Sequence, residues 1–235
     1  MKNKAIPVEQ FPSGEVEFDR APEEALIELS DIDEDAIIAD MRYYKQKIRF
    51  ATGKCYLRES VWEKLKYAVR LLPSGYKFKI YDGWRPFKVQ RALYDDYRKS
   101  LEDSYRGRPL PDDFEQLVAQ FVSVPNRDPE KPPVHCTGGA VDLTIVDTNG
   151  IELDMGGKFD DFREISNTAY FEKGGNTEAR DNRRLLYNIM LASGFSNLPS
   201  EWWHFDYGDR FWAIYYNQKA KYRGVWDIDR PSEGI

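Results

Sequence analysis

The sequence is poor in two residue types that often build functional sites, since its 235 residues include two cysteines and two histidines. Two cysteines are too few for a disulfide framework, and unpaired thiols fit a reducing compartment. Cys136 directly follows His135 in a segment that we expect to be extended, so its side chain should point away from that of His135 and be an inert, packed thiol. Any imidazole chemistry must therefore use His135, His204 or both.

Long hydrophobic runs are also lacking. None approaches the roughly 18 apolar residues that a membrane-spanning helix needs, and the mean hydropathy is -0.67. Residues 1–9 are basic but are not followed by the apolar stretch of a secretory signal, so we expect a cytoplasmic protein, although a signal removed earlier would leave no trace. Lysine and arginine are scattered and the net charge is -6, which argues against nucleic acid as a partner. The composition does not indicate an oligomeric state.

The chain has enough apolar material for a core, with 41% hydrophobic and 14% aromatic residues. No linker rich in glycine, serine or proline divides it, so we expect one compact domain in which residues 1–40 form an N-terminal wrapping segment around residues 41–235. Periodicity and turn residues predict helices near 22–29 and at 59–72, 87–100, 111–123 and 178–192. They predict strands at 41–50, 76–82, 139–146 and 202–207, a hairpin turn at Asn149-Gly150, a loop at 155–175 and a packed aromatic tail after 210.

The strand expected at 139–146 carries an acidic side chain. Alternation puts Ala140, Asp142 and Thr144 on one face and Val141, Leu143 and Ile145 on the other. An aspartate in so apolar a strand would be poorly solvated, and it normally needs a partner or a metal ion. Asp142 is therefore a candidate ligand.

Both histidines have a carboxylate close in sequence, because Asp142 follows His135 by seven residues and Glu201 precedes His204 by three. His135, Asp142 and His204 could supply three ligands of a catalytic zinc site, which leaves its fourth position to water. Glu201 could then act as the general base. In a regular strand Glu201 would face away from His204, so it must lie in the turn after Pro199. We predict one Zn²⁺ ion per chain.

Arg85 lies in Asp82-Gly-Trp-Arg-Pro86, where a strand ends in a corner framed by glycine and proline. A guanidinium held there near the metal could stabilise an oxyanion or bind a substrate carboxylate. The alternative is an ion pair with Asp82 or another carboxylate. The histidines have alternatives too, because a histidine among aromatic residues is often only packed, and a lone His-x6-Asp spacing recurs by chance. A structural zinc site would usually have four protein ligands rich in cysteine, and only Cys136 is close.

The ordered segments His135-x2-Gly138-x-Ala140-x-Asp142, Glu201-x2-His204 and 82–86 together resemble the zinc D-alanyl-D-alanine dipeptidases, in a D,D-peptidase family that also includes D,D-carboxypeptidases. The likeness runs from about residue 41 to 206 and includes the segment 155–160 and Asn182-Arg-Arg-Leu-Leu. It implies an α+β, Hedgehog-like fold, a single domain whose central antiparallel sheet carries the zinc site and is flanked by helices. Residues 41–235 would be the catalytic domain.

The resemblance also implies roles for individual residues. Those matching the zinc ligands are His135, Asp142 and His204. Glu201 would be the catalytic base, Arg85 would stabilise the transition state, and Asp160 would help to hold the free ammonium group of the substrate. The expected partner is a small D,D-dipeptide, and the expected reaction is zinc-dependent hydrolysis of D-alanyl-D-alanine or a related dipeptide.

One position departs from the family pattern. Pro133 lies two residues before the first metal histidine, at a position where the family commonly has serine. The hydroxyl and backbone of that serine help to bind the terminal carboxylate of the substrate. Proline has neither a hydroxyl nor an N–H group, so the change bears on the preference for D-Ala-D-Ala rather than on zinc chemistry. Two alternatives stay open, namely a D,D-carboxypeptidase acting on longer muropeptides and a metal-containing binding protein without catalysis.

Overall fold

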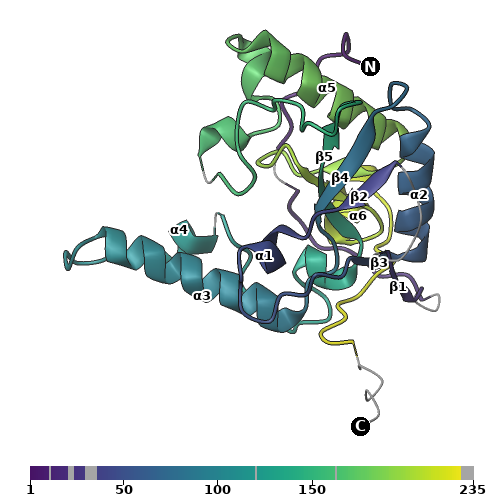
Figure 1. Cartoon of the computed structure of the whole chain (residues 1–235). Coiled ribbons are helices and arrows are strands. Elements are labelled where there is room, and N and C mark those ends of the chain that lie inside the picture. The colour runs from purple at the N-terminus through teal and green to yellow at the C-terminus, as the bar shows by residue number, and fades with distance from the viewer. Residues whose placement is uncertain (11, 21–23, 30–35, 120, 162, 229–235) are drawn as a thin grey trace.

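The computed structural model describes residues 1–10, 12–20, 24–29, 36–119, 121–161 and 163–228 (Figure 1). Their central feature is a five-stranded sheet in the order β2-β4-β5-β7-β6, and a two-stranded sheet pairs β1 with β3. The central strands are β2 (Ile37–Ala39), β4 (Lys77–Asp82), β5 (Ala140–Val146), β6 (Ser196–Asn197) and β7 (His204–Asp206). The smaller sheet consists of β1 (Leu26–Glu28) and β3 (Tyr56–Arg58).

The central sheet is mostly antiparallel. β5 is antiparallel to β4 and β7, and β6 is antiparallel to β7, whereas β2 runs parallel to β4. The predicted α+β class is confirmed, with the refinement that the sheet is mixed. Since β2 precedes residue 41, part of the N-terminal segment belongs to the sheet, and the division of the chain at residue 40 stays a prediction.

The middle strand, β5, is covered on both faces, and all of its residues are buried. Val141, Leu143 and Ile145 belong to the main hydrophobic core, as alternation predicts, so Asp142 points toward the opposite face. A strand with two buried faces can hold this carboxylate away from bulk water.

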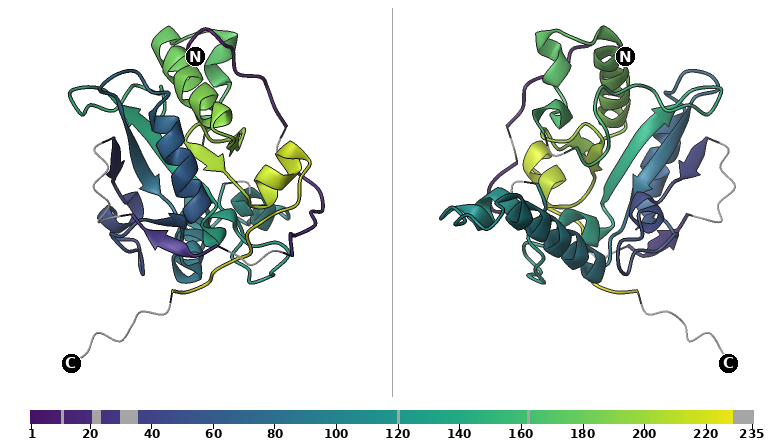
Figure 2. Two further views of the ribbon diagram at one scale, coloured as in Figure 1. Left: turned by 90° about the vertical axis from the view of Figure 1, so that its right-hand side faces the viewer. Right: turned by 60° about the vertical axis from the view of Figure 1, so that its left-hand side comes forward.

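Helices α2 (Glu59–Val69) and α5 (Thr177–Ala192) pack on the sheet (Figure 2). Apolar residues at helical spacing in the sequence predict both helices. Of these residues, Leu65, Leu186 and Ile189 are buried in the main core. The side chain of Asn176 caps α5 by accepting a hydrogen bond from the backbone N–H of Ala179, which explains why the helix starts there. Both predictions are confirmed.

Helices α3 (Phe87–Ser104) and α4 (Phe114–Ala119) form an arm that projects from the body (Figure 1). The prediction for α3 is confirmed, and the helix continues beyond residue 100. The predicted helix at 111–123 is helical only over α4. Tyr97 and Phe121 meet edge to face with ring centroids 6.0 Å apart, so aromatic packing helps to hold α3 against the segment that follows α4.

Two segments near the N-terminus differ from their predicted structure. Leu26–Glu28 is a strand rather than part of a helix, because antiparallel pairing with β3 decides its conformation, and the start of the predicted helix lies outside the described residues. Residues 41–50 contain the short helix α1 (Arg42–Lys45) rather than a strand. Lys47 and Phe50 have φ angles of 60° and 69°, which are incompatible with an extended path.

In the part of the chain that the structure describes, the connections contain three 3-10 helices, η1 (Val134–Thr137), η2 (Glu164–Ser166) and η3 (Tyr170–Lys173). The prediction of an extended segment around His135 is therefore wrong, since η1 occupies it. The predicted strand at 202–207 is regular only over β7. The aromatic tail packs on the body through α6 (Arg210–Tyr216) and the buried Tyr222, as predicted. Within the described ranges, no helix combines the length and the apolar character needed to cross a membrane.

Candidate metal centre and active-site cavity

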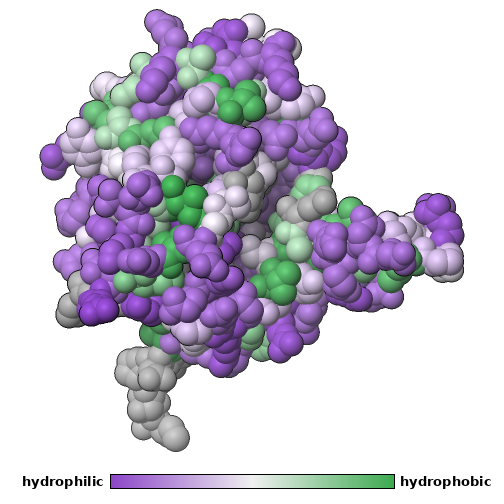
Figure 3. All heavy atoms as spheres, turned by 180° about the vertical axis from the view of Figure 1, so that it is seen from behind, coloured by the Kyte–Doolittle hydropathy of each residue, from purple (hydrophilic) through white to green (hydrophobic). Residues whose placement is uncertain are grey.

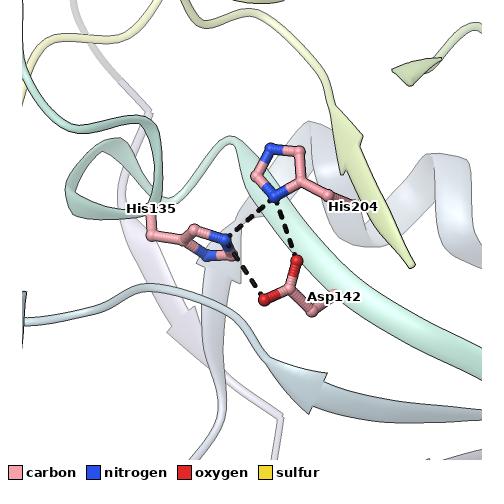
Figure 4. Close-up of side chains that lie close together, drawn as sticks. All are labelled: His135, Asp142 and His204. Atoms are coloured by element: carbon pink, nitrogen blue, oxygen red, sulfur yellow. Dashed lines mark hydrogen bonds and ion pairs between the residues drawn. The ribbon is translucent and has the colours of Figure 1, made fainter. Parts of the chain in front are cut away.

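Two histidines and one aspartate converge beside the sheet (Figure 4). His135 lies on η1, Asp142 on β5 and His204 on β7. All three side chains are buried, and one candidate ligand atom from each lies within 4.8 Å of the others. The pairing of β5 with β7 places Asp142 directly opposite His204, so the sheet register joins residues that are far apart in the chain.

The outer nitrogen of each imidazole already has a partner. Nδ1 of His135 donates to the carbonyl oxygen of Gly83 over 2.9 Å, and Nε2 of His204 donates to Oδ1 of Asp206 over 2.8 Å. In neutral rings the inner nitrogens then carry lone pairs, and these nitrogens lie 3.1 Å apart. Two lone pairs that face each other beside the carboxylate of Asp142 are suited to bind a cation as its ligands. The residues therefore fit a metal ion.

The electrostatics of this group agree with that interpretation. Burial alone would raise the pKa of Asp142, but the charge and hydrogen bonds of His135 and His204 hold it well below its usual range. Burial alone would lower the pKa of His204, but the carboxylates of Asp206 and Asp142 raise it well above its usual value. Both pKa shifts indicate that a positive charge is favoured at the point where the side chains of His135, Asp142 and His204 meet.

Two glycines let the backbone approach closely enough to hold His135. A Cβ atom at Gly83 would lie 2.7 Å from the carbonyl oxygen of Tyr56. Gly138 ends η1 with a φ of 75°, and a Cβ atom there would clash with the side chain of Leu26. At Gly138 only glycine satisfies both the left-handed conformation and the close contact, and at Gly83 the close contact alone excludes a side chain. These positions help to set the place of the imidazole.

Arg85 lies next to the metal centre and is buried. Its Nε donates to Oδ2 of Asp82 and its Nη1 to Oε1 of Gln90, each over 2.8 Å. Its Nη2 lies 3.8 Å from Oδ2 of Asp142. Burial would lower the pKa of Arg85, but Tyr43, Asp82 and Asp142 together raise it above its ordinary value. Arg85 thus forms the ion pair with Asp82 and also lies beside the metal ligands. The two interpretations are compatible, because the ion pair holds the guanidinium charge of Arg85 in a fixed place at the site.

Glu201 lies outside β7, in the irregular segment after Pro199, as its predicted role requires. Its Oε2 is 3.9 Å from Nδ1 of His204. Burial raises the pKa of Glu201, while the charge of His204 opposes the rise. A carboxylate with a raised pKa beside the metal centre is suited to accept a proton near neutral pH.

Asp160 faces the same cavity from the loop that follows the β5 hairpin. Its φ is 57°, and its Oδ1 accepts a hydrogen bond from the hydroxyl of Tyr43 over 3.3 Å. Burial, together with the charges of Asp142 and Glu201, raises the pKa of Asp160 to about 8. A cationic ligand beside Asp160 would favour its charged form.

These side chains line one cavity of about 440 Å³, and Pro133 forms part of its wall. The space-filling view shows the surface hollowed beside the base of the arm, with hydrophobic residues around the hollow (Figure 3). The apolar part of the cavity lining includes Leu93, Tyr97, Val122, Leu198 and Phe211. The cavity is large enough for a small peptide, and the departure from the family pattern at Pro133 lies inside it.

Sequence analysis does not identify three polar side chains of the site, Tyr43, Gln90 and Asp206. Asp206 had a usable signal, because residues two apart in a strand share a face and His204 is its partner. Tyr43 and Gln90 had none, since their contacts depend on how α1 and α3 pack. Cys136 is buried, as expected of a packed thiol, and its burial raises the pKa of the thiol to about 12; that the thiol is inert stays a prediction.

Comparison with known proteins agrees with the site. Residues 31–222 match the family model described as D-ala-D-ala dipeptidase. A D-alanyl-D-alanine dipeptidase of Synechocystis is 34% identical over 181 residues, which cover 69% of this chain and 73% of that protein. The D-alanyl-D-alanine dipeptidase of Escherichia coli is 30% identical over 161 residues, 68% of this chain and 70% of the relative. That of Enterococcus faecalis is 44% identical over 138 residues, 56% and 62% of the two chains.

The fold, the site and these matches define a metallopeptidase. The chain belongs to the D-Ala-D-Ala dipeptidase family of peptidases. The resemblance carried by the ordered motifs is thereby confirmed, as is the expectation of an enzyme that hydrolyses peptide bonds. The roles of the individual site residues remain predictions.

Proposed function

We propose that this metallopeptidase uses one zinc ion to hydrolyse D-alanyl-D-alanine or a closely related D,D-dipeptide. The observation that carries the proposal is the meeting of two imidazole nitrogens beside Asp142, one of which, Nδ1 of His204, lies 3.9 Å from the Glu201 carboxylate. The names of the relatives in Synechocystis and Escherichia coli support the substrate, since both are D-alanyl-D-alanine dipeptidases.

The donor set favours zinc over harder cations. Two nitrogens bound about 2.0–2.1 Å from a tetrahedral zinc ion lie about 3.3 Å from each other. The inner nitrogens of His135 and His204 are 3.1 Å apart. Imidazole ligands suit zinc, whereas magnesium and calcium prefer oxygen ligands alone.

The residues around the metal centre have different roles in the proposed reaction. When bound, zinc supplies Lewis-acid chemistry, which polarises a carbonyl group and makes water more acidic. Glu201 takes a proton from the attacking water and delivers it to the leaving amino group. Arg85, held by Asp82 and Gln90, stabilises the negative charge that develops on the former carbonyl oxygen.

The two ends of the substrate are recognised by different groups. Asp160, oriented by the hydroxyl of Tyr43, binds the free ammonium group and so selects substrates with an unblocked N-terminus. Pro133 offers neither a hydroxyl nor an N–H group to the terminal carboxylate. We therefore expect related D,D-dipeptides to be cleaved as well as D-alanyl-D-alanine.

The test combines metal content with one activity panel of D,D-, L,D- and L,L-dipeptides and an N-acylated D,D-tripeptide. The expected result is one zinc ion per chain, cleavage of D-alanyl-D-alanine that chelation abolishes and zinc restores, and rejection of the acylated peptide. Cleavage of the acylated tripeptide in preference to the free dipeptide would instead identify a D,D-carboxypeptidase. Full zinc occupancy without hydrolysis of any peptide would contradict the proposal and favour a binding protein.

A cytoplasmic location is a separate proposal. It is supported by the low cysteine content of the chain, whose two cysteines, Cys55 and Cys136, are both buried as thiols, because reducing compartments keep cysteines in the thiol form. Cell fractionation tests it, and recovery of the protein outside the cytoplasm would contradict it.

A further inference from the structure

Arg183, on α5, is a buried cation that the chemistry above does not use. Its side chain is among the largest that are fully buried, with 1% of the residue exposed. It forms no ion pair with any carboxylate of the described residues; instead its three donor groups are directed at backbone carbonyls. Burying a guanidinium is costly unless its hydrogen-bonding capacity is satisfied, so the contacts that it makes need an explanation.

Its hydrogen bonds all go to one loop, residues 155–168. Nε donates to the carbonyl of Met155, Nη1 to that of Asn167 and Nη2 to that of Ile165, each over 2.7 Å. The guanidinium also lies over the ring of Phe171, with its central carbon 4.7 Å from the ring centroid. Burial lowers the pKa of Arg183 to about 10, so the group stays charged at neutral pH while binding the two ends of the loop together.

One glycine at the start of the loop permits this arrangement. Gly156 has a φ of 72°, and a Cβ atom there would clash with the ring of Phe171. Gly157 packs next to Arg183, since a Cβ atom there would lie in van der Waals contact, 3.5 Å from Nη2. The Met-Gly-Gly segment and the arginine of α5, which are separate motifs in the sequence, are therefore two halves of one contact.

The same loop reaches the proposed ammonium site and the segment that carries the proposed base. Asp160, the proposed ammonium ligand, lies between Met155 and Ile165, the partners of Arg183. Just after Ile165, the carbonyl of Ser166 accepts a hydrogen bond from the N–H of Trp202 over 3.0 Å.

A second link joins the loop to the segment of the proposed base. The backbone N–H of Thr168 donates to the carbonyl of Pro199 over 2.9 Å. Its hydroxyl donates to the carbonyl of Glu201 over 3.1 Å. The loop thus carries Asp160 and is bonded on both sides of Glu201, so its shape determines how these two carboxylates lie relative to each other.

We propose that Arg183 is a positioning residue that sets the separation between Asp160 and Glu201, and thereby makes the enzyme selective for dipeptides with a free amino group. This inference rests on the proposed function, because it assigns the ammonium group to Asp160 and the general base to Glu201. A single buried cation shared by three carbonyls holds both ends of the loop at once, which separate surface contacts would not do. The guanidinium of arginine donates from three separate nitrogens, whereas the ammonium of lysine donates all of its hydrogen bonds from one nitrogen and cannot take the place of this fork.

The test compares Arg183→Lys with Arg180→Lys. Lysine keeps the charge of Arg183 but cannot bind all of its carbonyls, whereas Arg180, on the same helix, is partly exposed and pairs with Asp181. For R183K we expect KM for D-alanyl-D-alanine to rise about tenfold or more, since hydrogen bonds from a charged donor are lost, with a smaller change in kcat and with unchanged zinc content. The preference for the free dipeptide over its N-acetylated form should fall by a similar factor. R180K should match the wild type in both respects.

A second measurement does not depend on activity. Amide hydrogen exchange in metal-loaded R183K should rise by about tenfold in peptides that cover 155–168, and not in peptides from β5 or α2. Unchanged exchange and an unchanged preference for the free dipeptide would overturn the role of Arg183 while leaving the proposed function intact. A wild type that cleaves no D,D-dipeptide would contradict the proposed function. The exchange experiment would then still decide whether Arg183 holds the loop.

Discussion

His204 donates a hydrogen bond from Nε2 to Oδ1 of Asp206 over 2.8 Å, and both residues belong to β7. Residues two apart in a strand share a face, so the strand itself presents the carboxylate to the outer side of the imidazole. The bond leaves Nδ1 to face the metal centre. One short strand therefore supplies a proposed ligand and the group that orients it.

Asp206 should matter for metal affinity more than for folding. We expect Asp206→Asn to lower zinc affinity by about 10–100-fold, as is usual when a carboxylate behind a ligating histidine is lost. Competition with a chelator of known affinity measures the effect. Asp103→Asn, which changes an exposed pair with Lys99, is the control. Equal zinc affinities in the two variants would exclude the orienting role.

Glu201→Gln should separate metal binding from turnover. The amide keeps the size of the side chain but cannot accept the proton from water. We expect kcat to fall by about 10²–10⁴-fold, the usual contribution of a general base, with zinc content unchanged. Metal analysis and steady-state kinetics on the same preparation provide the measurement. A variant with near-normal kcat would remove Glu201 from the mechanism.

Asp160 should make the metal-free protein less stable as pH rises. Its pKa is raised to about 8 in the folded state, against about 3.9 in an unfolded chain. The folded state therefore holds an extra proton between these values, and the stability associated with it is fully present below about pH 4 and lost as pH rises through about 8.

Asp160→Asn removes this dependence. Relative to the wild type, the metal-free variant should gain thermal stability from pH 5 toward pH 9, while the loaded enzyme should lose affinity for the dipeptide. Thermal unfolding at several pH values and KM measurements check the two effects. Parallel stability curves for wild type and variant would show that Asp160 is not a buried carboxylate of raised pKa.

Gly83→Ala should displace the imidazole of His135. The new Cβ atom would lie 2.7 Å from the carbonyl oxygen of Tyr56, so the backbone must shift, at a cost of about 1–3 kcal/mol by analogy with overpacked cores. Because the carbonyl of Gly83 accepts the hydrogen bond from His135, zinc affinity should fall together with the free energy of unfolding. Gly157→Ala is the control, because Gly157, like Gly83, has no positive φ, and a Cβ atom there would make only van der Waals contacts of 3.5 Å or more. Equal zinc affinity in the two variants would count against this account.

Much of the fold follows from local patterns. The stripes of α2 and α5 and the alternation in β4 and β5 identify these elements because each buries one set of side chains at its own period. The same reasoning fails at Leu26–Glu28 and at 41–50. There, pairing with β3 and two residues with positive φ outweigh weak local preferences.

For the candidate site, the sequence by itself determined which residue types are present and at what spacing. This was enough to nominate the two histidines, Asp142, Glu201 and Arg85, and the resemblance to a known family added Asp160. Only the tertiary structure decided that they meet. The register of β5 with β7 places Asp142 opposite His204, and the packing of α1 brings Tyr43 to Asp160. The carbonyls that satisfy Arg183 come from both ends of a loop. Such contacts join residues far apart in the chain, and no local period encodes their distance.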